Sequence, residues 1–245
     1  MKPAVEKIEI AKQLQAKINA MQGLGKLSSE PALTGLAPFT AAFPGNIFPT
    51  GAVHEFITYE PANAAATSGF ITALTGKLIK TGGLCLWVAN GRKVFPAGLK
   101  HFGLEPDRVV FINVSRTKDA LWIIEEALKC EALTAVIGEV KELGFTESRR
   151  LQLAVEHSGV TCFIHHYCPY RENAVACTTR WKITALPSLA RDNLPGVGNS
   201  IWDVQLLKVR NGKPNSWQVS WQDKSFVPLD NKNLIISLIN ERHTG

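Results

Sequence analysis

Short apolar runs alternate with helix-like segments through the middle of the chain. Five runs are apolar almost throughout, as expected for strands buried on both faces, and they lie at 52–58, 84–89, 109–114, 135–139 and 160–167. The segments with helical spacing lie between them, at 68–80, 97–102, 118–130 and 146–158. Strands separated by helices predict a mostly parallel sheet covered on both faces, which is a doubly wound α/β architecture.

The pattern changes after Pro169, where helical spacing disappears. Three further strands are predicted at 178–184, 202–210 and 217–221. Asn211-Gly212 supplies a hairpin turn between the last two strands. We therefore expect the C-terminal third to extend the sheet in antiparallel fashion.

The N-terminal segment has a different pattern. Residues 3–21 place apolar side chains at roughly helical spacing among Lys and Glu, which predicts an exposed amphipathic helix. The stretch that follows, to residue 49, carries Gly, Pro, Ser and Thr without a sustained period and is typical of an irregular arm. Three parts are predicted: a helix and arm over 1–47, a main domain over 48–230 and a tail over 231–245.

Composition narrows the class of protein. With 245 residues, 45% of them apolar and 20% charged, the chain can bury a sizeable core, which excludes a disordered protein. Apolar stretches fall well short of the ~20 residues that cross a bilayer, and no signal-peptide pattern is present, so we expect a cytoplasmic protein without membrane contact. Five scattered cysteines favour reduced thiols. The net charge of +6 favours nucleic acid or an acidic partner.

The junction between the first strand and the following helix stands where a P-loop ATPase holds its triphosphate. A P-loop needs glycines whose backbone N–H groups cup the phosphates, a Lys on the β/γ oxygens and a Ser or Thr on the metal. Residues 60–69 contain no Lys, and Glu60 would repel a polyanion. The residues left at the phosphate-loop position are Asn63, Thr67, Ser68 and Gly69. Two interpretations remain: residual phosphate binding at a helix N-terminus, or a tight turn packed on the sheet.

Five segments in a fixed order carry a family resemblance. They read PTGAVHE at 49–55, PAGLKHFGL at 96–104, DALWIIEE at 119–126, AVIGEV at 135–140 running into TESRRLQLA at 146–154, and TTRWK at 178–182. The order of parts resembles a RecA-type ATPase core. Within that superfamily the chain is similar, over about residues 45–229, to the ImuA family, RecA-like proteins of bacterial damage-induced mutagenesis.

The resemblance identifies two further positions at which ATP chemistry is altered. The run 133–140 takes the place of the Walker B strand, where Glu139 replaces the usual Asp that organises the Mg²⁺ shell. Where a RecA-type domain carries an acidic general base, this chain has Asn90-Gly91-Arg92-Lys93, and a cation cannot polarise an attacking water. We therefore expect no ATP hydrolysis, no enzyme activity and no cofactor.

A cluster of thiols and imidazoles offers a candidate metal site. Cys162, His165, His166 and Cys168, with Cys177 farther on, are the side-chain types that zinc prefers. Along a strand, however, Cys162 and His166 share one face while His165 points to the other, and no second ligand pair follows. We expect half-buried side chains at a sheet edge rather than a metal. Without a Gly-x-Ser-x-Gly elbow, no catalytic nucleophile is assigned either.

Basic residues gather after the predicted Walker B strand. In RecA-like proteins the loops at this end of the sheet face DNA, so the resemblance implies single-stranded DNA or partner contacts here. The candidates are Arg149, Arg150, Tyr170, Arg171, Arg180 and Lys182. A Tyr beside cations could stack a base and bind phosphates, and a solvated basic face is the alternative.

The resemblance implies a non-catalytic RecA-like adaptor of the SOS response and DNA damage tolerance. As in the ImuA family, it would act in translesion synthesis with an inactive Y-family polymerase homologue resembling ImuB and an error-prone replicative-type polymerase, with RecA as an additional partner. Two alternatives remain open. One is a nucleotide-binding protein or enzyme using an altered phosphate loop, and the other is a cell-division inhibitor resembling SulA.

Overall fold

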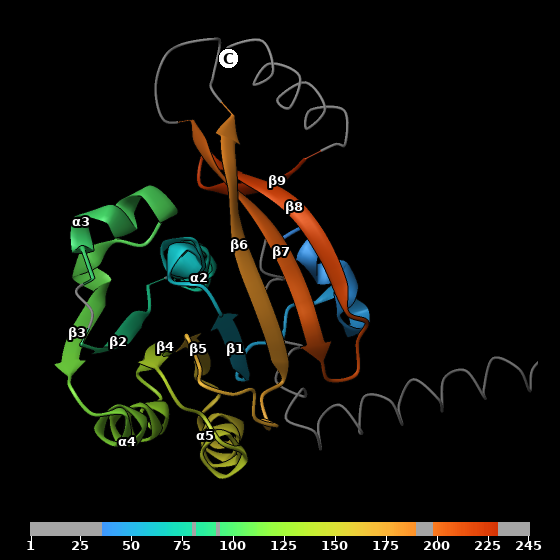
Figure 1. The fold of residues 1–245 in the computed structure, drawn as a ribbon. Coiled ribbons are helices and arrows are strands. Elements are labelled where there is room, and N and C mark those ends of the chain that lie inside the picture. The colour runs from blue at the N-terminus through green and yellow to red at the C-terminus, as the bar shows by residue number, and fades with distance from the viewer. Residues whose placement is uncertain (1–35, 80–81, 92–93, 190–197, 230–245) are drawn as a thin grey trace, which may run out of the picture.

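The computed structural model describes residues 36–79, 82–91, 94–189 and 198–229, which form a nine-stranded sheet with helices on both faces (Figure 1). The strand order is β3-β2-β4-β5-β1-β6-β7-β8-β9. The strands are β1 (Val53–Thr58), β2 (Leu84–Asn90), β3 (Val109–Val114), β4 (Leu133–Val140), β5 (Thr161–Tyr167), β6 (Thr179–Leu189), β7 (Asn199–Val209), β8 (Asn215–Gln222) and β9 (Ser225–Pro228). The helices are α2 (Ala64–Leu78), α3 (Pro96–Leu99), α4 (Thr117–Leu128) and α5 (Phe145–Ser158).

Strands β1 to β6 pair in parallel, and β7, β8 and β9 add to β6 in antiparallel fashion. The predicted α/β class with an antiparallel extension is confirmed, in an arrangement consistent with a RecA-like core. The prediction was wrong for β6, which was expected to begin the antiparallel part but pairs in parallel with β1. Residues 168–178 make this possible because they return from the carboxyl end of β5 to the start of β6.

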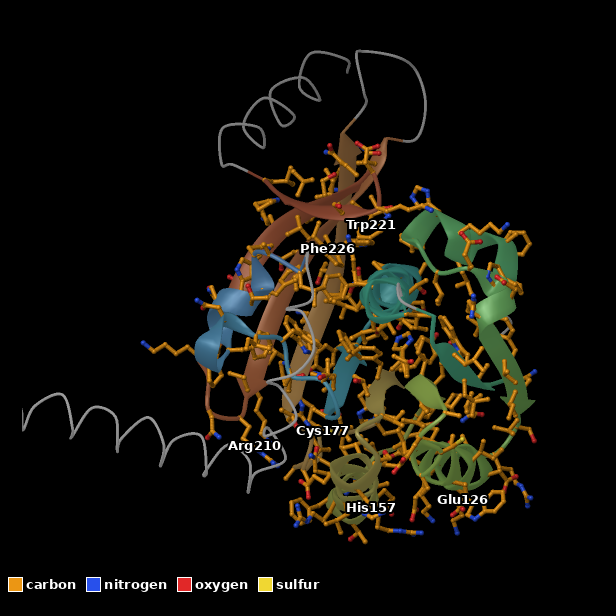
Figure 2. All side chains as sticks on the ribbon, turned by 180° about the vertical axis from the view of Figure 1, so that it is seen from behind. Glu126, His157, Cys177, Arg210, Trp221 and Phe226 are labelled. Carbon is orange, nitrogen blue, oxygen red and sulfur yellow. The ribbon has the colours of Figure 1, made fainter. Side chains whose placement is uncertain are left out.

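Helices α2 and α3 cover one face of the sheet, and α4 and α5 cover the other (Figure 1). The α2 face is rich in aromatic rings, with Phe56 stacked on Trp181 at a centroid distance of 6.0 Å. Trp221 and Phe226 lie together at the far end of this layer (Figure 2). Trp202, Trp217 and Trp221 pack on the same cluster, which confirms the interpretation of these tryptophans as packing residues. None of the described helices is long and apolar enough to span a membrane.

The described end of the predicted N-terminal arm is part of the core. Phe39 is fully buried and contacts the rings of Phe70 and Trp181 at 5.4 and 6.1 Å. The carbonyl of Ala42 accepts a hydrogen bond from the N–H of Lys213, which follows the β7–β8 turn. A Cβ at Gly212 would lie 2.4 Å from that carbonyl oxygen, so the turn needs glycine for this contact. Residues 36–43 therefore pack with the main domain, and the boundary at residue 48 stays a prediction. The predicted helix over 3–21 and the tail over 231–245 lie outside the described residues.

Two predicted elements differ in detail. The helix expected over 97–102 is split into α3 and a 3₁₀ turn, Lys100–Phe102. Strand β9 was missed because its four residues, two of them exposed, carry too short a pattern for sequence analysis.

A histidine is buried at the start of β1. His54 is fully enclosed; its Nε2 donates to the carbonyl of Pro49 at 2.8 Å, and its Nδ1 accepts from the hydroxyl of Thr179 at 2.7 Å. That hydroxyl in turn accepts from the indole N–H of Trp181 at 2.7 Å. Burial lowers the pKa of His54 to about 4, so the ring is neutral near pH 7 and its Nδ1 is free to accept from Thr179.

We expect His54 to make folding pH-dependent. Its pKa is about 4 in the folded protein against an ordinary value of 6.5, so the unfolded chain binds more protons between these values. The free energy of unfolding should therefore fall as the pH drops from about 6.5 to 4, by up to roughly 3 kcal/mol. Urea unfolding across this range measures it. In the His54→Gln variant, the free energy of unfolding should lose this part of its dependence on pH. The control His157→Gln, at an exposed position, should keep it. Equal slopes for His54→Gln and the unaltered chain would contradict the assignment.

Candidate functional site

The junction between β1 and α2 is a short 3₁₀ turn, Pro61–Asn63, that runs directly into the helix. The side-chain oxygen of Asn63 accepts a hydrogen bond from the backbone N–H of Ala185 at 3.0 Å. This bond attaches the turn to β6. At the position predicted for a phosphate loop, Asn63 thus has a partner within the protein.

The hydroxyl of Thr67 belongs to a chain of hydrogen bonds. The Nε2 of His165 lies 2.9 Å from the hydroxyl of Thr58, which donates to the hydroxyl of Thr67 at 2.8 Å. Thr67 in turn donates to the carbonyl of Asn63 at 3.1 Å and is fully buried. A hydroxyl that both accepts and donates internally is poorly placed to hold a metal.

Ser68 and Gly69 also have structural neighbours. The hydroxyl of Ser68 lies 3.4 Å from Nδ1 of His165. A Cβ at Gly69 would lie 2.8 Å from the ring of Phe102, so glycine lets this ring pack on α2. The structure brings together all four residues predicted at the phosphate-loop position, and their arrangement favours the tight turn packed on the sheet. A role in nucleotide binding stays a prediction.

Glu139 lies near the carboxyl end of β4 and is 3% exposed. Its carboxylate accepts from the indole N–H of Trp87 at 3.3 Å. It lines two neighbouring hollows, of about 320 and 210 Å³, of which the smaller has apolar walls that include Phe95 and Phe102. Asn90, at the predicted general-base position, donates to the hydroxyl of Thr117 at 3.0 Å, while residues 92–93 lie outside the described residues.

A second polar cluster, on the α5 face, was missed by sequence analysis. Its centre is Glu55 on β1, which is fully buried. The carboxylate accepts from Nδ1 of His166 on β5 at 2.8 Å and from Nε of Arg180 on β6 at 2.7 Å. The other ring nitrogen of His166 lies 3.2 Å from the carbonyl of Lys141, so both nitrogens face acceptors. The available signal was a carboxylate inside the apolar run VHEFIT, because an internal charge requires a partner.

The crossover segment, residues 168–178, lies on this face and has no helix or strand of its own. Its backbone groups are paired by side chains from other elements: Nζ of Lys208 donates to the carbonyl of Val175 at 2.8 Å, and Arg210 donates to that of Ala176 at 3.3 Å. The N–H of Ala176 donates to the hydroxyl of Ser148 on α5 at 2.9 Å. Figure 2 shows Cys177 and Arg210 side by side at the end of this segment. Only the first part of the crossover segment is therefore an exposed loop.

Of the six predicted DNA or partner contacts, three are exposed without a described ion pair, and the other three have partners within the protein. Arg149 and Arg171 are exposed, as is Tyr170 at 86%. Arg150 forms an ion pair with Glu125 of α4 at 2.6 Å while remaining largely exposed. Lys182 is half-buried, with Nζ 5.8 Å from the ring of Tyr59.

Arg180 differs most from its predicted role. Its side chain is 14% exposed and points into the α5 face. Besides Glu55, it donates to the carboxylate of Glu172 at 3.4 Å and to the carbonyl of Asn173 at 2.8 Å. All three guanidinium nitrogens thus have acceptors within the protein. The guanidinium group is therefore held inside the structure rather than presented at the surface.

The thiol and imidazole cluster is divided between the two faces. Cys162 packs in the α5 face and His166 bonds Glu55 there, whereas His165 bonds Thr58 on the α2 face. Among the described residues, no group of three or more His, Cys, Asp or Glu side chains is placed to hold a metal ion. Burial raises the pKa of the Cys162 and Cys177 thiols, which disfavours the thiolate that metal binding and nucleophilic attack require.

Comparison with known proteins provides the family. The sequence is 30% identical over 211 residues to "Protein ImuA" of Caulobacter vibrioides, in strains NA1000 / CB15N and CB 15, and the match covers 81% of this chain and 84% of each relative. The chain belongs to the ImuA family. No protein-family model matches it.

This ImuA-family protein should not respond to nucleotide. A ligand present at one hundred times its Kd adds roughly 2.7 kcal/mol of stability, which for a domain of this size would raise the Tm by several degrees. Because Thr67 is internally bonded and residues 60–69 contain no Lys, we expect millimolar ATP·Mg²⁺ to leave the Tm unchanged in differential scanning calorimetry. A shift with ATP that is absent with equimolar pyrophosphate·Mg²⁺ would contradict this and favour a nucleotide-binding protein.

Proposed function

We propose that the chain is a non-catalytic, RecA-like adaptor in DNA damage tolerance. It acts in the cytoplasm with an inactive Y-family polymerase homologue resembling ImuB and with an error-prone replicative-type polymerase in translesion synthesis, and RecA is an additional partner. The observation that carries the proposal is the internal hydrogen bonding of the β1–α2 junction. The hydroxyl of Thr67 is held between Thr58 and Asn63 inside a sheet whose order is consistent with a RecA-like core.

In this proposal the chain keeps the framework of an ATPase but does not use ATP. In a P-loop ATPase the first turn of the helix after β1 must leave backbone and hydroxyl groups free for phosphates and metal. Here that turn bonds to β6 through Asn63 and to β5 through the Thr67, Thr58 and His165 chain. The framework remains available as a scaffold for partner surfaces. The alternative of a SulA-like inhibitor would be favoured if overproduction of the chain made cells filamentous.

Deletion of the gene should lower damage-induced mutation while leaving recombination intact, because an adaptor of translesion synthesis is not required for strand exchange. Mutation frequency after ultraviolet irradiation, with recombination measured in the same strains, tests this. The tagged chain should also copurify the ImuB-like homologue after nucleotide is removed with apyrase. Normal induced mutagenesis in the deletion strain would overturn the adaptor proposal.

A second function, contact with single-stranded DNA, is favoured by one observation. Tyr170 is 86% exposed at the tip of an otherwise anchored segment, and exposed Arg171 follows it. An aromatic ring beside a cation can stack a base while the cation binds phosphate. We include Arg149 of the neighbouring helix, and we keep Arg150 and Lys182 as secondary contacts because each also has a partner within the protein.

Replacing Tyr170, Arg171 and Arg149 together with Ala should weaken single-strand binding about tenfold or more, because base stacking alone contributes ~1–3 kcal/mol. The slope of log affinity against log salt should also become shallower by roughly 0.7 for each phosphate that the variant no longer binds. Fluorescence anisotropy with a labelled oligonucleotide at several salt concentrations measures both. The control is Lys213→Ala, an exposed cation beside the β7–β8 turn. Equal affinity and slope for the triple variant would leave these residues as solvated surface.

A further inference from the structure

The exposed tip of the crossover segment depends on side chains from outside it. In the tip, residues 168–174, the N–H of Cys168 donates to the carbonyl of Thr58 at 2.7 Å, and the described bonds beyond it involve side chains. Asn173 supplies two contacts: its side chain donates to the carbonyl of Leu143 at 3.2 Å, and its own carbonyl accepts from Arg180 at 2.8 Å. Glu172 accepts from the hydroxyl of Tyr59 at 2.5 Å and from Arg180 at 3.4 Å.

On the side away from the tip, Arg180 is held by Glu55. Its Nε lies 2.7 Å from the carboxylate of Glu55, which is completely buried and cannot lose its compensating partners without a large penalty. A guanidinium group is planar, so fixing the Nε edge also fixes the directions of the two terminal nitrogens. Those nitrogens then meet Glu172 and the carbonyl of Asn173 at the bend after Arg171.

We propose that Arg180 is a positioning residue. It transmits the fixed location of Glu55 to the bend at Glu172 and Asn173, and it thereby holds Tyr170 and Arg171 outward as a preformed contact element for single-stranded DNA. The DNA part rests on the proposed function, whereas the ordering of the tip does not. This role replaces the direct contact that sequence analysis assigned to Arg180.

Loss of the bonds from Arg180 should disturb the tip alone. Beyond the tip, Val175 and Cys177 are buried in the α5 face, and Lys208, Arg210 and Ser148 bond the neighbouring backbone. Removing the hydrogen bonds from Arg180 to the tip therefore leaves the second half of the crossover segment anchored. A preformed tip also avoids the entropic cost of ordering a loop when a partner binds.

The test is Arg180→Lys in the full-length chain. An ammonium group can remain beside Glu55, but it cannot also bond Glu172 and the carbonyl of Asn173 in fork geometry. Backbone order parameters from NMR relaxation for residues 170–174 should fall from values typical of rigid backbone to below about 0.6, while those of α5 and β1 stay unchanged. Affinity for a labelled single-stranded oligonucleotide should fall in parallel. Arg149→Lys, which makes the same chemical change at an exposed position on α5, should leave the order parameters of 170–174 unchanged.

The outcomes separate the two proposals. Lower order parameters in 170–174 with unchanged DNA affinity would support the positioning role and overturn the DNA contact. Unchanged order parameters in a folded Arg180→Lys variant would overturn the positioning role, whether or not affinity falls. If Arg180→Lys does not fold, Glu172→Ala takes its place, because that side chain is 52% exposed and its loss removes the bonds from Arg180 and Tyr59 without removing a partner of Glu55. Unchanged order parameters in this variant would likewise overturn the proposal.

Discussion

The charge of Glu55 is a constraint on which much of the α5 face depends. A carboxylate in the middle of a parallel sheet has no water to stabilise it, so cationic or hydrogen-bonding groups must come from the strands on either side. His166 comes from β5 and Arg180 from β6, and each makes further bonds to a connecting segment. One buried charge thus joins three strands, the β4–α5 connection and the crossover segment.

The parallel part of the fold could be predicted from sequence because its strands are buried on both faces and its helices carry a regular period. The direction of β6 could not, since Thr179 pairs with His54 only through a crossover that has no secondary structure to recognise. The arm near Phe39 has the composition of a linker because Gly and Pro surround residues whose burial depends on distant rings. In both cases tertiary contacts, rather than local pattern, determine the structure.

At the candidate site, too, local sequence predicted some features and tertiary contacts determined others. Residue types at the β1–α2 junction indicated a missing phosphate loop, and the structure adds that the hydroxyl of Thr67 is bonded on both sides within the protein. Among the basic residues, sequence identified cations but not their direction. Arg171 is exposed and Arg180 faces inward, a distinction that depends on the position of Glu55 across the sheet. Family membership supports a shared biological system, and these contacts support the proposal that the chain works without ATP.

The crossover segment is shaped by side chains that belong to other elements, including Ser148, Arg180 and Lys208. Because backbone bonds to β1 reach only the two ends of the segment, at Cys168 and Thr178, mutations in its exposed part can reshape the tip while the sheet keeps its register. The shape of this surface is thereby separated from the stability of the sheet. If the tip is the contact element proposed above, a few substitutions there can change what it binds, on a scaffold that remains the same.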